Sequence, residues 1–209
     1  MSLYFNPVMC LLWPGDDRLS PLTYSLEERD ADQTATRLAR ALAERIRPVE
    51  PVNFIGHSLG CRVALETMTR LAGSGVMVEH VLLMAAAVDA DALSRSSRYR
   101  DAVNRARRVF WLASERDRVL RYAFPVGDLV AAILFGGYTQ AALGLVGPRA
   151  ARKPDSPVPT TVSGRSLTEF DIDHGDYLPG NQWPPDQKHR GAAHYAAQVL
   201  GGILDPTYP

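Results

Sequence analysis

The sequence contains little cysteine and no excess of either charge. Two cysteines occur in 209 residues, too few for the disulfide framework of a small secreted fold. Cys10 lies in an apolar run and Cys61 at the start of an expected helix, so both are predicted to be small buried hydrophobic residues in a reducing cytoplasm. Basic and acidic residues number 23 each. This balance gives no reason to expect nucleic acid or an anionic membrane surface as a partner.

Several short motifs are also missing. The sequence has no His-x-x-x-His, Cys-x-x-Cys or EF-hand pattern, so we expect no metal. It has no phosphate-binding P-loop and no Gly-x-Gly-x-x-Gly after a strand, so we expect no cofactor. The first residues lack the basic region of a signal peptide. The sequence carries no signal for an oligomeric state.

The longest apolar segment, 124–146, is not expected to cross a membrane. Pro125, Asp128 and several glycines interrupt it, whereas a membrane helix needs about 20 consecutive apolar residues. A pair of short helices forming a cap over a site fits this composition better. We therefore expect a single domain over residues 1–209, with a cap or lid insertion at about 120–150.

The sequence does contain the pattern of a nucleophile elbow. Residues 52–55 are β-prone and lead into Gly56-His57-Ser58-Leu59-Gly60, and a helical pattern follows directly. In such an elbow the serine lies on a sharp strand-to-helix turn. We expect Gly56 and Gly60 to be glycines because side chains there would collide with the neighbouring strand and helix. The Leu59 amide, at the helix N-terminus, is expected to donate to an oxyanion.

The remaining pattern alternates strands with helices, which predicts an α/β fold. We expect a three-layer α/β/α architecture, with a mostly parallel sheet of about five to six strands. The expected strands are 8–13, 52–55, 78–88, 109–113 and 167–172. The expected helices are 27–47, 62–71, about 92–107 and 191–204.

Three residues are the candidates for catalysis. A serine hydroxyl is a weak nucleophile unless a base accepts its proton and a carboxylate orients that base. Ser58, Asp117 and His174 each follow an expected strand, and such positions meet at the C-terminal edge of a parallel sheet. Their order along the chain is the one expected for α/β-hydrolases.

The base is predicted by elimination among the five histidines. His57 lies inside the elbow, where its ring is expected to point away from the serine. His80 opens a strand at the opposite edge of the sheet, and His189 and His194 are expected on the surface. His174 alone follows a strand and precedes a glycine, which lets a loop present its ring.

The acid has competitors. Asp89 and Asp91 follow the strand after the elbow strand, where they could also cap a helix. Glu115 shares a loop with Asp117, but a strand ending near residue 113 favours the later residue. Asp117 is therefore the predicted acid.

These residues resemble the α/β-hydrolase superfamily, in particular bacterial families known as α/β-hydrolases of unknown function. The resemblance is carried by the Gly56–Gly60 elbow and by Trp13-Pro14 ending an earlier strand, with weaker similarity over 83–91 and 113–121. It covers roughly residues 8–121 and resumes at 167–178. It implies a serine esterase or lipase-like enzyme with Ser58 as nucleophile, Asp117 as acid and His174 as base.

The sequence departs from the superfamily before the elbow. Members normally carry an upstream strand ending in His-Gly, whose loop gives the second oxyanion donor, and that segment is absent here. Either strand 8–13 takes the place beside the nucleophile strand, so that Gly15 or Asp16 donates the second amide, or the true start of the protein lies upstream. Pro14 has no amide hydrogen to donate.

Two functions from different classes are compatible with these patterns. The first is hydrolysis of a small-molecule carboxylic ester, with an acyl or lipid chain bound by the segment 124–146. Thioesters, amides and acyl transfer belong to the same chemistry. The second is a non-catalytic protein on a hydrolase scaffold, whose apolar cap binds a lipid or a protein.

Overall fold

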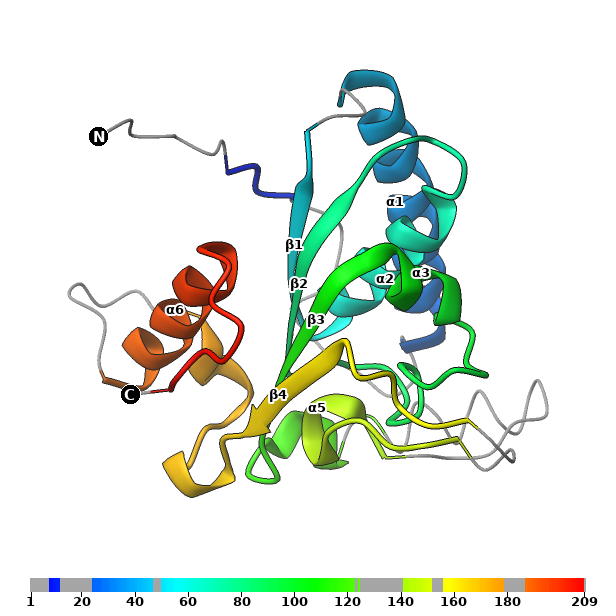
Figure 1. The fold of residues 1–209 in the computed structure, drawn as a ribbon. Helices are drawn as coiled ribbons and strands as arrows, with labels where there is room; N and C mark the ends of the chain where they lie inside the picture. The colour runs from blue at the N-terminus through cyan, green and yellow to red at the C-terminus, as the bar shows by residue number, and fades with distance from the viewer. Residues whose placement is uncertain are drawn as a thin grey trace, which may run out of the picture.

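A parallel sheet forms the centre of the molecule. The computed structural model describes residues 8–11, 24–46, 50–122, 124, 141–151, 156–178 and 187–208. Within these ranges the sheet has four strands in the order β1-β2-β3-β4, and each pairs in parallel with the next (Figure 1). The strands are β1 (Val52–His57), β2 (Val78–Met84), β3 (Ala106–Ala113) and β4 (Val162–Ser166). The predicted parallel α/β architecture is confirmed, although the described strands number four and not the expected five to six.

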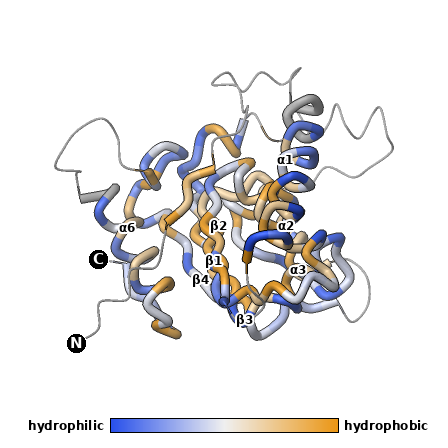
Figure 2. The backbone as a smooth tube through the Cα atoms, turned by 90° about the horizontal axis from the view of Figure 1, so that it is seen from above, coloured by the Kyte–Doolittle hydropathy of each residue, from blue (hydrophilic) through white to orange (hydrophobic). Residues whose placement is uncertain are grey.

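Helices cover both faces of this sheet, as Figure 1 shows. On one side lie α1 (Tyr24–Arg45), α2 (Leu59–Arg70) and α3 (Arg100–Arg105). On the other lies α6 (Gln187–Leu200). The central strands follow a hydrophobic path and the outer turns of α1 a hydrophilic one (Figure 2). The apolar side chains of the strands are thus buried between two helical layers.

Small residues bring α1 close to α2. Ala31 and Ala35 recur one turn apart and are fully buried against Val63 of α2. With no side chain beyond Cβ, these alanines let the two helix backbones approach closely. Thr67 of α2 is also fully buried, and its hydroxyl donates to the Val63 carbonyl one turn earlier. This packing fixes the helix that begins at the elbow.

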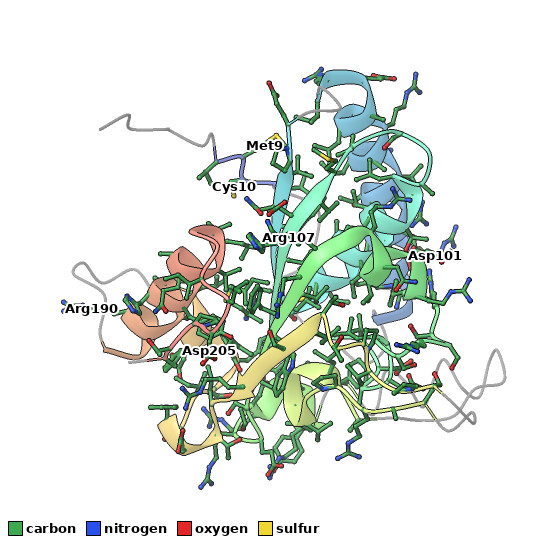
Figure 3. The ribbon with its side chains drawn as sticks, in the orientation of Figure 1. Met9, Cys10, Asp101, Arg107, Arg190 and Asp205 are labelled. Carbon is green, nitrogen blue, oxygen red and sulfur yellow. The ribbon has the colours of Figure 1, made fainter. Side chains whose placement is uncertain are left out.

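The apolar run at the N-terminus does not form the predicted strand. Residues 8–11 lie outside any strand, and Val8 is 90% exposed. Met9 and Cys10 protrude from this segment (Figure 3), so the prediction that Cys10 is buried is wrong. An apolar run predicts burial only where another surface covers it, and no described strand pairs with this segment. Trp13 lies outside the described residues.

Two elements differ from the expected ones between β2 and β3. The strand predicted at 78–88 ends at Met84, because Ala85 takes a left-handed conformation (φ 46°) that breaks the ladder. The predicted helix at 92–107 is mostly turns, and α3 occupies only Arg100–Arg105. Serine side chains satisfy the backbone in those turns, as when Ser97 donates to the Ala92 carbonyl.

The last strand lies earlier than predicted. β4 covers Val162–Ser166, whereas the expected range 167–172 forms a 3-10 turn, η1 (Thr168–Phe170), between buried Leu167 and Ile172. Only a glycine fits at position 164, because a Cβ there would lie 2.1 Å from the Trp111 carbonyl oxygen. β4 has five residues, of which three are polar. It therefore lacks the apolar pattern by which a buried strand is predicted from sequence.

The segment predicted to form a cap lies mainly outside the described residues. Its described parts are Phe124 and the stretch that contains α5 (Leu143–Val146). Within the described ranges no helix is both long and apolar enough to cross a membrane.

Candidate active site

Ser58 occupies a strained turn between β1 and α2. Its backbone angles are φ 54° and ψ −127°, a region that costs a residue with a side chain about 1–3 kcal/mol. The neighbouring turn holds this conformation: the Ser58 amide donates to the Met84 carbonyl (3.0 Å), and the Ala87 amide donates to the Ser58 carbonyl (3.3 Å). These two hydrogen bonds tie the elbow to the turn that follows β2.

Steric contact explains the glycine at position 56 of the elbow but not the glycine at position 60. A Cβ on Gly56 would lie 2.8 Å from Cα and 2.9 Å from N of Cys61. Position 56 therefore has no room for a side chain, as predicted. A Cβ on Gly60 would meet no atom within 4 Å. The expectation that Gly60 is required to avoid a collision is wrong, because α2 points this position into open space.

The structure brings together three residues that are far apart in the chain. His174 Nε2 lies 3.0 Å from Ser58 Oγ, and His174 Nδ1 lies 2.7 Å from Asp117 Oδ2. A carboxylate can only accept, so we assign the ring hydrogen to Nδ1, which leaves Nε2 to accept the serine proton. Asp117 is fully buried, and its second oxygen accepts from the Leu120 amide at 2.8 Å. The arrangement matches a serine–histidine–carboxylate triad.

The competing residues lie elsewhere. His80 is buried on β2, and His194 is exposed on α6. Asp89 is exposed in the turn after β2, and Glu115 is exposed at the start of the acid loop. Asp91, in the same turn as Asp89, is half-buried. Of the five predicted site residues, Gly15 lies outside the described residues.

His174, the predicted base, lies on a short 3-10 helix and not directly after a strand. This helix, η2 (His174–Tyr177), is capped by Asp173, whose Oδ1 accepts from the His174 amide at 2.8 Å. Arg118, next to Asp117, donates from its amide (2.9 Å) and its Nε (2.6 Å) to the two oxygens of the same carboxylate. Although partial burial raises the pKa of Asp173, these hydrogen bonds and the Arg118 charge outweigh it and lower that pKa overall. Arg118 and Asp173 thus join the acid loop to the base loop.

His57 also reaches the base, which sequence reasoning missed. Its Nε2–H donates to the His174 carbonyl oxygen at 2.8 Å, and the two rings lie 4.8 Å apart. The expectation that this ring points away from the serine is therefore incomplete, because the ring turns toward His174, the predicted base. Burial, and then the neighbouring His174, lower the pKa of His57 to about 4.

Comparison with known proteins gives one family match. Residues 7–109, just under half of the chain, match the family model of the thioesterase domain, an α/β-hydrolase-fold serine hydrolase family. This match supports the predicted resemblance to the α/β-hydrolase superfamily. The matched residues contain the elbow but end before Asp117 and His174. No curated protein and no solved structure matches the chain.

A helix N-terminus directly follows the serine, as in the nucleophile elbow of α/β-hydrolases. Leu59 is the first residue of α2, so its amide has no carbonyl one turn earlier to bind. It lies where the superfamily stabilises an oxyanion.

An open cavity of about 580 Å³ lies beside the base loop. Its lining is mostly charged and includes no elbow residue: Glu115, Arg116, Arg118, Arg121, Tyr122, Asp171, Asp173 and Asp176. Such a lining does not suit an acyl chain. Apolar residues instead gather beside the elbow, where Leu59, Phe124 and Ala142 belong to one buried cluster.

Proposed function

We propose that this protein is a serine hydrolase that cleaves acyl esters, including thioesters, through an acyl-enzyme on Ser58. The superfamily and the similarity to the thioesterase domain support hydrolysis of an acyl ester or thioester bond. The observation that carries the residue assignment is the continuous contact from Asp117 through His174 to Ser58, with Ser58 in the strained elbow conformation.

Acylation begins at the serine. Ser58 Oγ attacks the carbonyl carbon of the substrate while His174 Nε2 accepts the hydroxyl proton. The negative charge moves to the former carbonyl oxygen, where the Leu59 amide donates to it. Asp117 keeps the His174 ring oriented and stabilises the imidazolium that forms. As the tetrahedral intermediate collapses, His174 returns the proton to the leaving alcohol or thiol.

Deacylation repeats the same steps with water. His174 Nε2 accepts a proton from a water molecule, whose oxygen attacks the acyl carbon. The Ser58 oxygen then leaves and regains a proton from His174. The products are a carboxylic acid and free enzyme, so the cycle needs no cofactor.

We propose that the acyl chain binds against the cap segment at about 120–150, within a single domain over 1–209. The two described ends of that segment support this assignment. Phe124 and Ala142 are both buried in the cluster that contains Leu59, the residue after the nucleophile. The residues between these ends are mostly apolar in sequence.

Paired substrates test this proposal. Oxygen esters and thioesters of the same short and medium acyl chains would be supplied to the wild type, to Ser58→Ala and to Ser96→Ala. Ser96 is an exposed serine away from the elbow, so its variant is the matched control. We expect turnover in the wild type and Ser96→Ala, and its loss in Ser58→Ala by about 10⁶-fold.

A folded wild type without turnover on either substrate series would contradict the proposal and favour a non-catalytic binding protein on the same scaffold. A preference for the thioester beyond the difference in the intrinsic reactivity of the two bonds would define the substrate class. That correction is needed because a thiol, with a pKa of about 8.5, is a better leaving group than an alcohol.

A further inference from the structure

The residue before the nucleophile contacts the base. His57 is the last residue of β1, and its Nε2–H donates to the carbonyl oxygen of His174 at 2.8 Å. Ser58, the next residue, contacts the ring of the same histidine at 3.0 Å. Two consecutive elbow residues therefore hold the two ends of His174, its backbone and its reactive nitrogen.

His57 acts here as a neutral donor. A carbonyl oxygen accepts and cannot donate, so the hydrogen of the neutral ring lies on Nε2. The groups that face the ring are His174 and Tyr177, with ring centroids 4.8 and 5.9 Å away, and the charge of Asp117 also acts on it. Near neutral pH the ring is uncharged and carries one hydrogen, directed at His174.

Besides its contact with Ser58, His174 is held by three hydrogen-bonded contacts, of which the one with His57 is the third. The His174 amide donates to Asp173, its Nδ1 faces Asp117, and its carbonyl accepts from His57. The Asp173 and Asp117 contacts tie the base to its own loop and to the acid loop. His57 ties it to the elbow, one residue before Ser58.

We propose that His57 is a positioning residue for catalysis, which holds His174 at the distance from Ser58 that proton transfer requires. This inference rests on the proposed function. A misplacement of about 1 Å in such an arrangement costs about 100-fold in rate. Loss of the His57 donor should therefore lower turnover and leave substrate binding nearly unchanged.

The test compares His57→Phe, which keeps a ring but removes the donor, with His57→Gln, which keeps an amide N–H donor. His80→Phe is the matched control, because His80 is also a buried histidine but lies on β2, away from the triad. The measurements are kcat, KM and the rate of labelling by a fluorophosphonate. The downfield proton resonance of the His174–Asp117 hydrogen bond is recorded for each variant.

We expect His57→Phe to lower kcat and the labelling rate by about 10–100-fold with KM little changed. The downfield resonance should broaden or shift, His57→Gln should recover much of the rate, and His80→Phe should react like the wild type. If His57→Phe does not fold, His57→Ala against His57→Gln gives the same comparison.

Two results would overturn the inference while the proposed function stands: wild-type kcat in folded His57→Phe, or no recovery in His57→Gln. An unreactive wild type would instead contradict the proposed function, and the inference with it.

Discussion

Gly56→Ala tests the packing of the elbow with a single methyl group. The new Cβ would lie 2.8 Å from Cα and 2.9 Å from N of Cys61 and 3.0 Å from the carbonyl carbon of Gly60. The shortest distance is about 0.7 Å below ordinary carbon contact at ~3.5 Å. All three atoms belong to backbone, so the first turn of α2 must shift as a unit.

Overpacking of this kind costs about 1–3 kcal/mol. For a chain of this length, Tm should fall by roughly 2–12 °C. The turn that moves carries the Leu59 amide and adjoins Ser58, so turnover should fall by about 100-fold or more. Circular dichroism melting and ester turnover measure these two effects.

Gly60→Ala is the matched control four residues later. A Cβ at position 60 meets no atom within 4 Å, and alanine favours a helix over glycine by up to about 1 kcal/mol. We expect this variant to be as stable as the wild type or more stable, with wild-type turnover. Equal losses in the two variants would refute the steric explanation, as would a fully active and stable Gly56→Ala.

Three further outcomes follow from the site. Asp117→Asn should lower kcat by about 10⁴-fold with Tm little changed, because the amide permits the wrong tautomer of His174; melting and turnover check this, and a variant with wild-type activity would exclude Asp117 as the acid. Arg118→Ala should slow fluorophosphonate labelling several-fold and leave Tm almost unchanged, because the Arg118 side chain is 78% exposed; unaltered labelling would show that the Arg118–Asp173 pair does not order the base loop. The free energy of unfolding should decrease as the pH falls from about 6.5 to about 4. The pKa of His57 is lowered in the fold, so the unfolded chain binds a proton there first, and stability present above pH 6.5 is lost toward pH 4. Denaturant unfolding at several pH values in this range should give a smaller loss of unfolding free energy with falling pH for His57→Phe than for the wild type. An equal loss in the two proteins would contradict the lowered pKa of His57.

The elbow could be predicted from the sequence because its strand, turn and helix follow one another directly in the chain. A β-prone run, a glycine, a serine and a helical pattern adjoin one another at 52–66. Strand β1 and helix α2 form there. Ser58 and Asp117 lie near each other because each follows a strand of the parallel sheet, and the chain after β4 brings His174 to the same edge.

The parts that could not be predicted depend on contacts distant in sequence. The sequence predicts the last strand too late in the chain, because three of the five residues of β4 are polar and the buried Leu167 and Ile172 follow it outside the sheet. The contact of His57 with the His174 backbone joins residues 117 positions apart. A histidine next to an elbow serine nevertheless indicates a contact with the base loop, because that loop must approach the same turn.

The region before the elbow shows that an apolar run alone does not establish a buried strand. Residues 8–11 are apolar yet exposed, because a run of this kind predicts a buried strand without specifying what covers it. The predicted donor Gly15 lies outside the described residues, so its role in oxyanion binding stays a prediction.

The central claim is that the fold activates Ser58. The most direct measurement is reaction with a fluorophosphonate followed by mass spectrometry of the intact protein and its peptides. We expect one adduct on the folded wild type, mapped to Ser58, which is absent from Ser58→Ala and strongly slowed in Asp117→Asn. A folded wild type that forms no adduct, or one that carries its adduct on another serine, would contradict the account.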